Sequence, residues 1–161
     1  MPAPWFDGRM IRRRAVADLP ACVRVLRAVH LHSGYPYAWP ADPAAWLTPE
    51  GLTGAWVAED ADGRVAGHAA LCGREVSRLY VDPAARGQGL GGRLLRAVTE
   101  AAAAGGLRPV LAVHAADTAA IALYERRGWR CTGTERQDWG GRSPVTVRYY
   151  EAPVAPPRTP G

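Results

Sequence analysis

Apolar residues recur at helical spacing in three segments of the chain. They follow Asp18, whose side chain is suited to cap a helix, and they return over residues 89–104 and 117–127. Glycines come directly after the last two segments, and glycine commonly ends a helix because it tolerates a positive φ. The pattern therefore predicts three helices.

Short apolar runs between turn residues predict the strands. They occupy residues 10–15, 55–59, 64–72, 75–81, 109–113, 129–135 and 144–151. Three consecutive strands in the first half imply an antiparallel meander, whereas the strand–helix–strand order of the second half makes its flanking strands parallel neighbours. The expected fold class is α/β (α+β), with a mixed sheet and helices on both of its faces.

Between His30 and Gly51 the helical pattern is lost. Four aromatic residues stand there among four prolines, and the segment predicts an aromatic-rich loop with one short helix. The aromatic residues are Tyr35, Tyr37, Trp39 and Trp46. Residues 1–8 and 153–161 are predicted tails. The length of 161 residues favours a single domain over 1–161, with a core at about 10–151.

The basic residues narrow the possible chemistry. All 20 of them are arginines, so a Schiff-base lysine and the lysine of a phosphate-binding P-loop are excluded. The net charge of +5 favours an anionic ligand. Because the arginines are scattered and no RNA-binding aromatic motif accompanies them, we expect no nucleic-acid partner.

The cysteines and the hydropathy indicate the compartment. Three cysteines lie far apart without a CxxC pair, which favours reduced thiols in a cytoplasmic protein. No apolar stretch approaches the ~20 residues of a membrane span, so no membrane association is expected. His30 and His32 have no ligand pattern beside them, and no metal is predicted.

A glycine-rich turn between a strand and a helix is the most informative segment. Uncovered backbone N–H groups and a helix N-terminus there would bind a pyrophosphate. Gly87, Gly89 and Gly92 satisfy GxGxxG, the dinucleotide fingerprint, but the turn follows a meander instead of a first βαβ strand. Arg86, Gly89 and Gly91 satisfy the alternative pattern Arg-x-x-Gly-x-Gly.

This second pattern resembles the acyl-CoA signature of the GCN5-related N-acetyltransferase (GNAT) superfamily. About 30 residues later, Asp117-x-x-Ala-x-x-Leu-Tyr124-x-x-x-Gly-Trp129 resembles a second family motif, with Asp in place of Asn and Trp in place of Phe. The resemblance covers residues 10–151. It implies the acyl-CoA N-acyltransferase fold, a mixed and mostly antiparallel sheet of six or seven strands. It also implies acetyl-CoA as the acyl donor.

The resemblance also implies where acetyl-CoA lies. The strands at 75–81 and 109–113 should splay apart at a β-bulge, and the backbone of Leu79 and Val81 should bind the pantetheine arm. Amides from Arg86 to Gly92 should hold the pyrophosphate. The expected cofactor-binding residues are Leu79, Tyr80, Val81, Arg86, Gly87, Gln88, Gly89, Leu90, Gly91, Gly92, Asp117 and Tyr124.

Two residues are predicted to be catalytic. The family position of Tyr124 implies a general acid for the departing thiol. Glu75 is the candidate base, because it shares strand parity with Leu79 and Val81 if no bulge intervenes. Relatives that acetylate ribosomal-protein N-termini place a base glutamate on the fifth strand, where this chain has Ala112.

The acceptor is expected opposite the CoA entrance. The aromatic segment would form one wall there and residues 138–141 a second wall. We expect acetyl transfer to a primary amine of a small molecule by direct attack. Acetylation of a protein or peptide N-terminus and a non-catalytic acyl-CoA-binding module remain the alternatives. Alternating apolar residues in 144–151, expected near a sheet edge, predict a possible homodimer.

Overall fold

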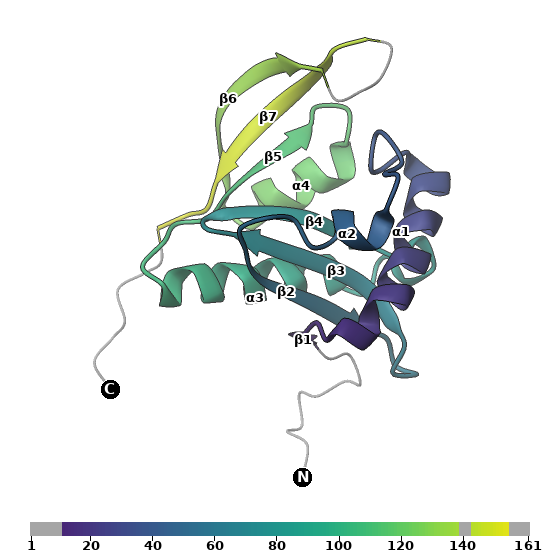
Figure 1. Cartoon of the computed structure of the whole chain (residues 1–161). Helices are drawn as coiled ribbons and strands as arrows, with labels where there is room; N and C mark the ends of the chain where they lie inside the picture. Colours follow the sequence, from purple (N-terminus) through teal and green to yellow (C-terminus); the bar gives the residue numbers. More distant parts are fainter. Residues whose placement is uncertain (1–10, 139–142, 155–161) are drawn as a thin grey trace, which may run out of the picture.

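The computed structural model describes residues 11–138 and 143–154. Seven strands form one sheet in the order β1-β2-β3-β4-β5-β7-β6 (Figure 1). The strands are β1 (Ile11–Arg13), β2 (Leu52–Glu59), β3 (Val65–Cys72), β4 (Glu75–Val81), β5 (Val110–His114), β6 (Arg130–Gln137) and β7 (Val145–Glu151). The helices are α1 (Leu19–Ser33), α2 (Pro43–Trp46), α3 (Leu90–Ala104) and α4 (Thr118–Arg126), with 3-10 turns η1 (Val16–Asp18) and η2 (Pro83–Ala85).

Every pair of neighbouring strands in this described sheet is antiparallel except β4 and β5. The predicted mixed, mostly antiparallel sheet of six or seven strands is therefore confirmed. The helix α1 continues to Ser33, three residues beyond the point where the helical pattern is lost, and ends at Gly34 with φ 79°. The one short helix expected in the aromatic segment is α2.

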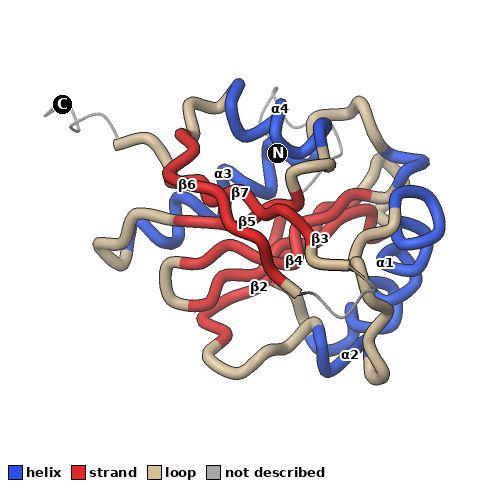
Figure 2. The backbone as a smooth tube through the Cα atoms, turned by 90° about the horizontal axis from the view of Figure 1, so that it is seen from above, coloured by secondary structure: helices blue, strands red, loops and turns tan. Residues whose placement is uncertain are grey.

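Helices cover both faces of the sheet, as predicted. Figure 2 shows α1 and α2 on one side and α3 and α4 on the other. Buried residues of α1, including Leu26, pack with Val57 and Tyr80. Buried residues of α3 and α4, including Leu94, form the larger cluster on the opposite face. Burial of these apolar faces fixes the helices against the strands.

A β-bulge interrupts β4. His68 pairs with Tyr80 and Ala70 pairs with Ser77, so two residues of β4, Arg78 and Leu79, oppose one residue of β3. Arg78 has φ 50°, in the left-handed region that non-glycine residues seldom adopt. The bulge predicted from the family resemblance is therefore present.

Buried His68 holds the bulge in place. Its ring stacks on Tyr80 at a centroid distance of 5.3 Å, and its Nδ1 lies 2.8 Å from the carbonyl oxygen of Arg78. Its Nε2 lies 3.0 Å from Nη1 of Arg14. Because a guanidinium only donates, Nε2 must accept, and Nδ1 must carry the proton that it donates to Arg78. His68 is therefore a buried structural residue.

The bulge overturns one premise about Glu75. In a regular strand Val76 and Tyr80 would share a face, but Val76 packs in the α3 cluster and Tyr80 in the α1 cluster. Leu79 and Val81 pack against the α3 cluster. Glu75 therefore faces away from Leu79 and Val81, and the predicted shared parity is wrong.

The last strand lies near the sheet edge, as expected, but it is not the exposed edge strand. β7 lies between β5 and β6, because the chain returns from the outer strand β6 into the sheet. The apolar alternation of β7 is therefore internal, and the edge strand β6 is exposed and largely polar. The edge-pairing argument for a homodimer no longer holds.

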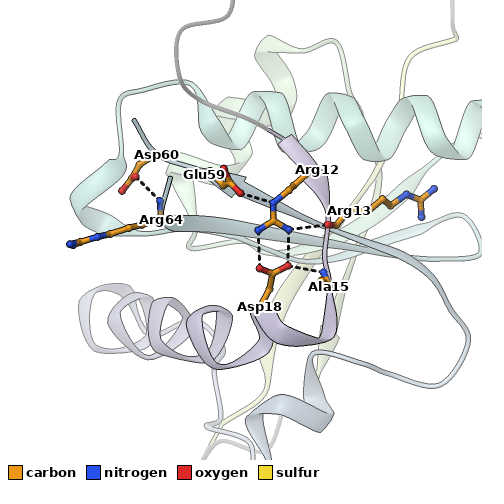
Figure 3. A network of polar contacts seen from close by, with 7 residues as sticks. All are labelled: Arg12, Arg13, Ala15, Asp18, Glu59, Asp60 and Arg64. Carbon is orange, nitrogen blue, oxygen red and sulfur yellow. Dashed lines mark hydrogen bonds and ion pairs between the residues drawn. The ribbon is translucent and has the colours of Figure 1, made fainter. Parts of the chain in front are cut away.

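An arginine network joins β1 to η1 and β2 (Figure 3). Arg12 forms two hydrogen bonds of 2.8 Å with Asp18 and one of 2.5 Å with Glu59. The hydrogen bonds from Arg12 lower the pKa of Asp18. Asp18 also accepts from the backbone N–H of Ala15 at 2.7 Å. Asp18 precedes α1 as predicted, but its side chain caps this preceding turn and makes no cap hydrogen bond to α1.

Within residues 11–138 and 143–154, the helices are too short or too polar to cross a bilayer.

The first prediction concerns the pH dependence of stability. Burial lowers the pKa of His68 to about 4 from the ordinary value of 6.5. The unfolded chain then binds a proton that the folded chain excludes, so stability should fall by roughly 3 kcal/mol as the pH drops from 7 to 4. His68→Asn keeps a donor for Arg78 and removes the titration. Denaturant unfolding at pH 7 and pH 5 should show a smaller pH effect in this variant than in the parent. Equal losses in the two proteins would contradict the role assigned to His68.

Candidate functional site

The divergence of β4 from β5 opens a cavity. The two strands pair at one position only, Glu75 with Val110, and then separate. A cavity of about 910 Å³ occupies the gap. Its walls come from β4, β5, the glycine-rich turn, one face of α4, the end of α1 and the segment around α2. Its size is within the range of sites that enclose small organic ligands.

The glycine-rich turn gives the cavity one end. Gly87 and Gly89 have φ 81° and 77°, and a Cβ built on either would meet no atom within 4 Å. The first helical bond of α3 runs from Arg93 N–H to Gly89 C=O, so the amides just before Arg93 have no partner inside the helix. These amides and the helix dipole make an anion site beside the cavity.

The open edge of β4 gives the cavity backbone donors. The N–H of Asp82 donates to Ala66 of β3 at 2.7 Å. Because amides alternate along a strand, those of Leu79 and Val81 point the other way, toward the gap between β4 and β5. This orientation is the one that the predicted pantetheine contacts require.

Tyr124 lies on α4 at the wall of the cavity and is 7% exposed. Its ring packs near Trp129 and Tyr150, with centroid distances of 6.1 Å and 6.0 Å. Burial raises the pKa of Tyr124, and the Tyr35 phenol and the Asp117 carboxyl act in the same direction. The hydroxyl therefore keeps its proton at neutral pH and is available as a donor.

Asp117 and Glu75 are the carboxylates that line the cavity within the described ranges. Asp117 accepts a hydrogen bond from Ala120 N–H at 3.1 Å and so caps α4, which accounts for an acidic residue there. Glu75 is exposed at the start of β4 and has no ion-pair partner among the described residues. Its carboxylate is accessible to a ligand.

Three of the four predicted aromatic wall residues line the cavity, namely Tyr35, Tyr37 and Trp46. Trp39 does not. Its ring packs on His30 at 5.2 Å and under the guanidinium of Arg27 at 5.2 Å. The other predicted wall, residues 138–141, lies largely outside the described residues.

Of the twelve predicted cofactor-binding residues, all but Gln88 line the cavity. His114, which follows β5, also lines it, with its ring 6.2 Å from that of Tyr37. The sequence analysis missed Arg78, Ser33 and Gln137 as lining residues. Arg78 could not be distinguished from the other 19 arginines in the sequence. The bulge that turns it toward the cavity does not change the pattern of hydrophobic residues.

Among the described residues, no group of three or more His, Cys, Asp and Glu side chains is placed to hold a metal ion.

Comparison with known proteins gives the family. The family model described as "Acetyltransferase (GNAT) family" matches residues 21–129. An L-methionine sulfoximine/L-methionine sulfone acetyltransferase from Pseudomonas aeruginosa is 34% identical over 139 residues, which cover 76% of this chain and 81% of the relative.

Two solved structures share the fold. A phosphinothricin acetyltransferase from Sinorhizobium meliloti, solved in complex with acetyl-CoA, has a TM-score of 0.73 and 25% identity, over 91% of this chain and 88% of its own. The ribosomal-protein-S18-alanine N-acetyltransferase from Escherichia coli has a TM-score of 0.72 and 23% identity, over 91% and 94%. From the family match and the identity to the Pseudomonas enzyme, we conclude that the chain belongs to the GNAT family of acetyltransferases.

Proposed function

We propose that this enzyme transfers the acetyl group of acetyl-CoA to the primary amine of a small molecule by direct attack within a ternary complex. The observation that carries the proposal is one continuous cavity. It joins the glycine-rich anion site, the open edge of β4, a buried tyrosine hydroxyl and an accessible carboxylate.

The residues present fit acetyl-CoA. Open space over Gly87 and Gly89 leaves room for phosphate oxygens at the start of α3. The amides of Leu79 and Val81 are oriented to pair with the pantetheine arm, as another strand would. Arg86 lines the same end of the cavity and adds positive charge. The cofactor supplies the activated acetyl group.

Residues of the protein transfer the protons of the reaction. The attacking amine must be neutral, and an alkylamine is almost wholly protonated at pH 7. We assign Glu75 to accept a proton from the amine, directly or through water. A backbone N–H at the bulge stabilises the charge that develops on the carbonyl oxygen. As the N–C bond forms and the C–S bond breaks, Tyr124 donates its proton to the departing sulfur.

A small-molecule acceptor is favoured over a protein. The Pseudomonas relative is named for two small molecules, methionine sulfoximine and methionine sulfone. An enzyme named for the alanine of ribosomal protein S18 shares the same fold, so the fold alone does not select the acceptor. This chain has Ala112 on β5, where N-terminal acetyltransferases of that type are expected to carry their base. We also propose a cytoplasmic location, in keeping with the unpaired thiols of Cys22, Cys72 and Cys131.

Release of free CoA thiol tests the proposal. The protein is incubated with acetyl-CoA and, in separate reactions, with amino acids, aminoglycosides, simple amines and short peptides. Thiol release with one or more small amines, above the rate without acceptor, is expected. Release with peptides alone would favour a protein acceptor. Protection from heat by acetyl-CoA without release in any reaction would indicate a non-catalytic module.

The second prediction concerns cofactor binding. Gly89→Val places a branched side chain in the space assigned to a phosphate. The affinity for acetyl-CoA should fall at least about tenfold, or ~1.4 kcal/mol, by isothermal titration. Gly63→Val is the matched control, because Gly63 also has φ 77° and open space but lies in the exposed β2–β3 turn. Both variants bear the same backbone strain, and only Gly89→Val should lose affinity. Equal affinities would remove this turn from the site.

The third prediction concerns Tyr124→Phe, which removes only the hydroxyl. If Tyr124 protonates the departing thiolate, kcat should fall about 10²-fold while the KM for acetyl-CoA changes little. The defect should shrink with an acyl donor whose thiol is more acidic. A tyrosine that only packs would instead give a lower melting temperature with near-normal kcat. A kcat within about threefold of the parent would exclude Tyr124 as the general acid.

A further inference from the structure

Arg78 stands at the acceptor side of the cavity with most of its donors unused. It is half-buried, lines the cavity and follows Ser77 at the β-bulge. Its Nε donates to the carbonyl oxygen of Trp46 at 3.0 Å, and its guanidinium lies 4.4 Å from the centre of the Trp46 ring. Its Nη1 and Nη2 have no hydrogen-bond partner among the described residues.

Four other arginines among the described residues form ion pairs with carboxylates. Arg12 binds two of them, Arg74 and Arg108 share Glu151, and Arg96 binds Glu100. Arg78 has no carboxylate partner within residues 11–138 and 143–154. A half-buried guanidinium gains most from an anion that binds it through two parallel hydrogen bonds.

We propose that Arg78 binds the carboxylate of the acceptor, so that the acceptors of this enzyme are free amino acids. This inference rests on the proposed function, because it assigns a substrate class to the same cavity. The contacts with Trp46 hold the plane of the guanidinium. The two free terminal nitrogens then offer the fork that matches a carboxylate.

The position of Arg78 places this carboxylate near the reaction. Arg78 is a bulge residue and directly precedes Leu79, whose amide points into the gap between β4 and β5. An amino acid whose carboxylate binds Arg78 can therefore place its amine at the bulge. Glu75 faces the same side of the sheet as Tyr80 and α1, and it supplies the negative charge that attracts the ammonium group before its deprotonation. Arg78 would bind the carboxylate and Glu75 the ammonium group of a zwitterionic amino acid.

Around Arg78, the described part of the acceptor wall is mostly uncharged, and His114 lies beside Tyr37 as its one titratable group apart from the tyrosines. Tyr35, Tyr37, Trp46 and Ser33 line it, and they would surround the amino-acid side chain with aromatic surface and hydroxyl groups. Such a wall suits uncharged side chains and disfavours a second bare charge. Both acceptors in the name of the Pseudomonas relative are amino acids with uncharged polar side chains, which agrees with this assignment.

The fourth prediction compares each amino acid with its own amide. Methionine sulfone, methionine, phenylalanine and glutamine are each assayed as the acid and as the primary amide, which keeps the amine and removes the negative charge. For the best acceptor, kcat/KM for the acid should exceed that for the amide roughly 10²-fold in the parent enzyme. The difference should lie mainly in the KM of the acceptor.

Arg78→Asn tests the residue itself. Asparagine tolerates the left-handed conformation that the bulge requires, so the backbone is kept and the charge is lost. The acid-to-amide ratio should approach one, while the KM for acetyl-CoA stays unchanged. Arg78→Lys keeps the charge without the fork and should keep part of the ratio. Arg96→Met removes an arginine that is 75% exposed on α3 and should leave the ratio as in the parent.

Each outcome decides the proposal. Equal transfer to acids and amides by the parent enzyme would overturn the role of Arg78 and leave the acetyltransferase function standing. Transfer to none of the small amines would overturn the proposed function and the role of Arg78 with it. A ratio that persists in folded Arg78→Asn would assign carboxylate binding to another residue. Should that variant fail to fold, the ratio in the parent enzyme still decides whether a carboxylate is required.

Discussion

The β-bulge in β4 is the constraint on which the site depends. One extra residue turns the strand, so β4 leaves β5 after a single paired position and the cavity opens between them. The same residue exchanges the two faces of the strand, which sends Tyr80 under α1. His68 fixes the bulge from the neighbouring strand, and Arg14 fixes the tautomer of His68. The contact of the buried, uncharged His68 with the half-buried Arg14 therefore helps to set the shape of the reaction site.

Most of the helices and strands could be predicted from the sequence. Periodicity and glycines located the helices and strands to within a few residues, because each element is long enough to show its own spacing. The two glycine-containing motifs then placed the turn before α3 and the tyrosine of α4 in one family pattern. In the structure these two distant segments line the same cavity. Sequence patterns within one helix, strand or turn were sufficient to predict a residue's position where that position depends on its own element alone.

Features that depend on contacts between elements could not be predicted from the sequence. The face of Glu75 was misassigned, because alternation carries no trace of a bulge that the partner strand holds in place. The strand at 144–151 was expected near an edge and open to pairing, but the order of strands depends on how the chain returns, and β6 covers that side of β7. Arg78 was overlooked for the same reason, since its lack of a carboxylate partner is a property of the assembled fold.

The left-handed backbone at Arg78 has a consequence for thermal adaptation. An arginine in this conformation costs about 1 kcal/mol relative to a glycine, which adopts it freely. Selection for heat resistance alone would therefore favour glycine or asparagine at this position. Such a replacement would relieve the backbone cost, but it would remove the guanidinium from the cleft together with its contacts to Trp46. The backbone strain of this position and the chemistry of the reaction site are therefore in conflict at one residue.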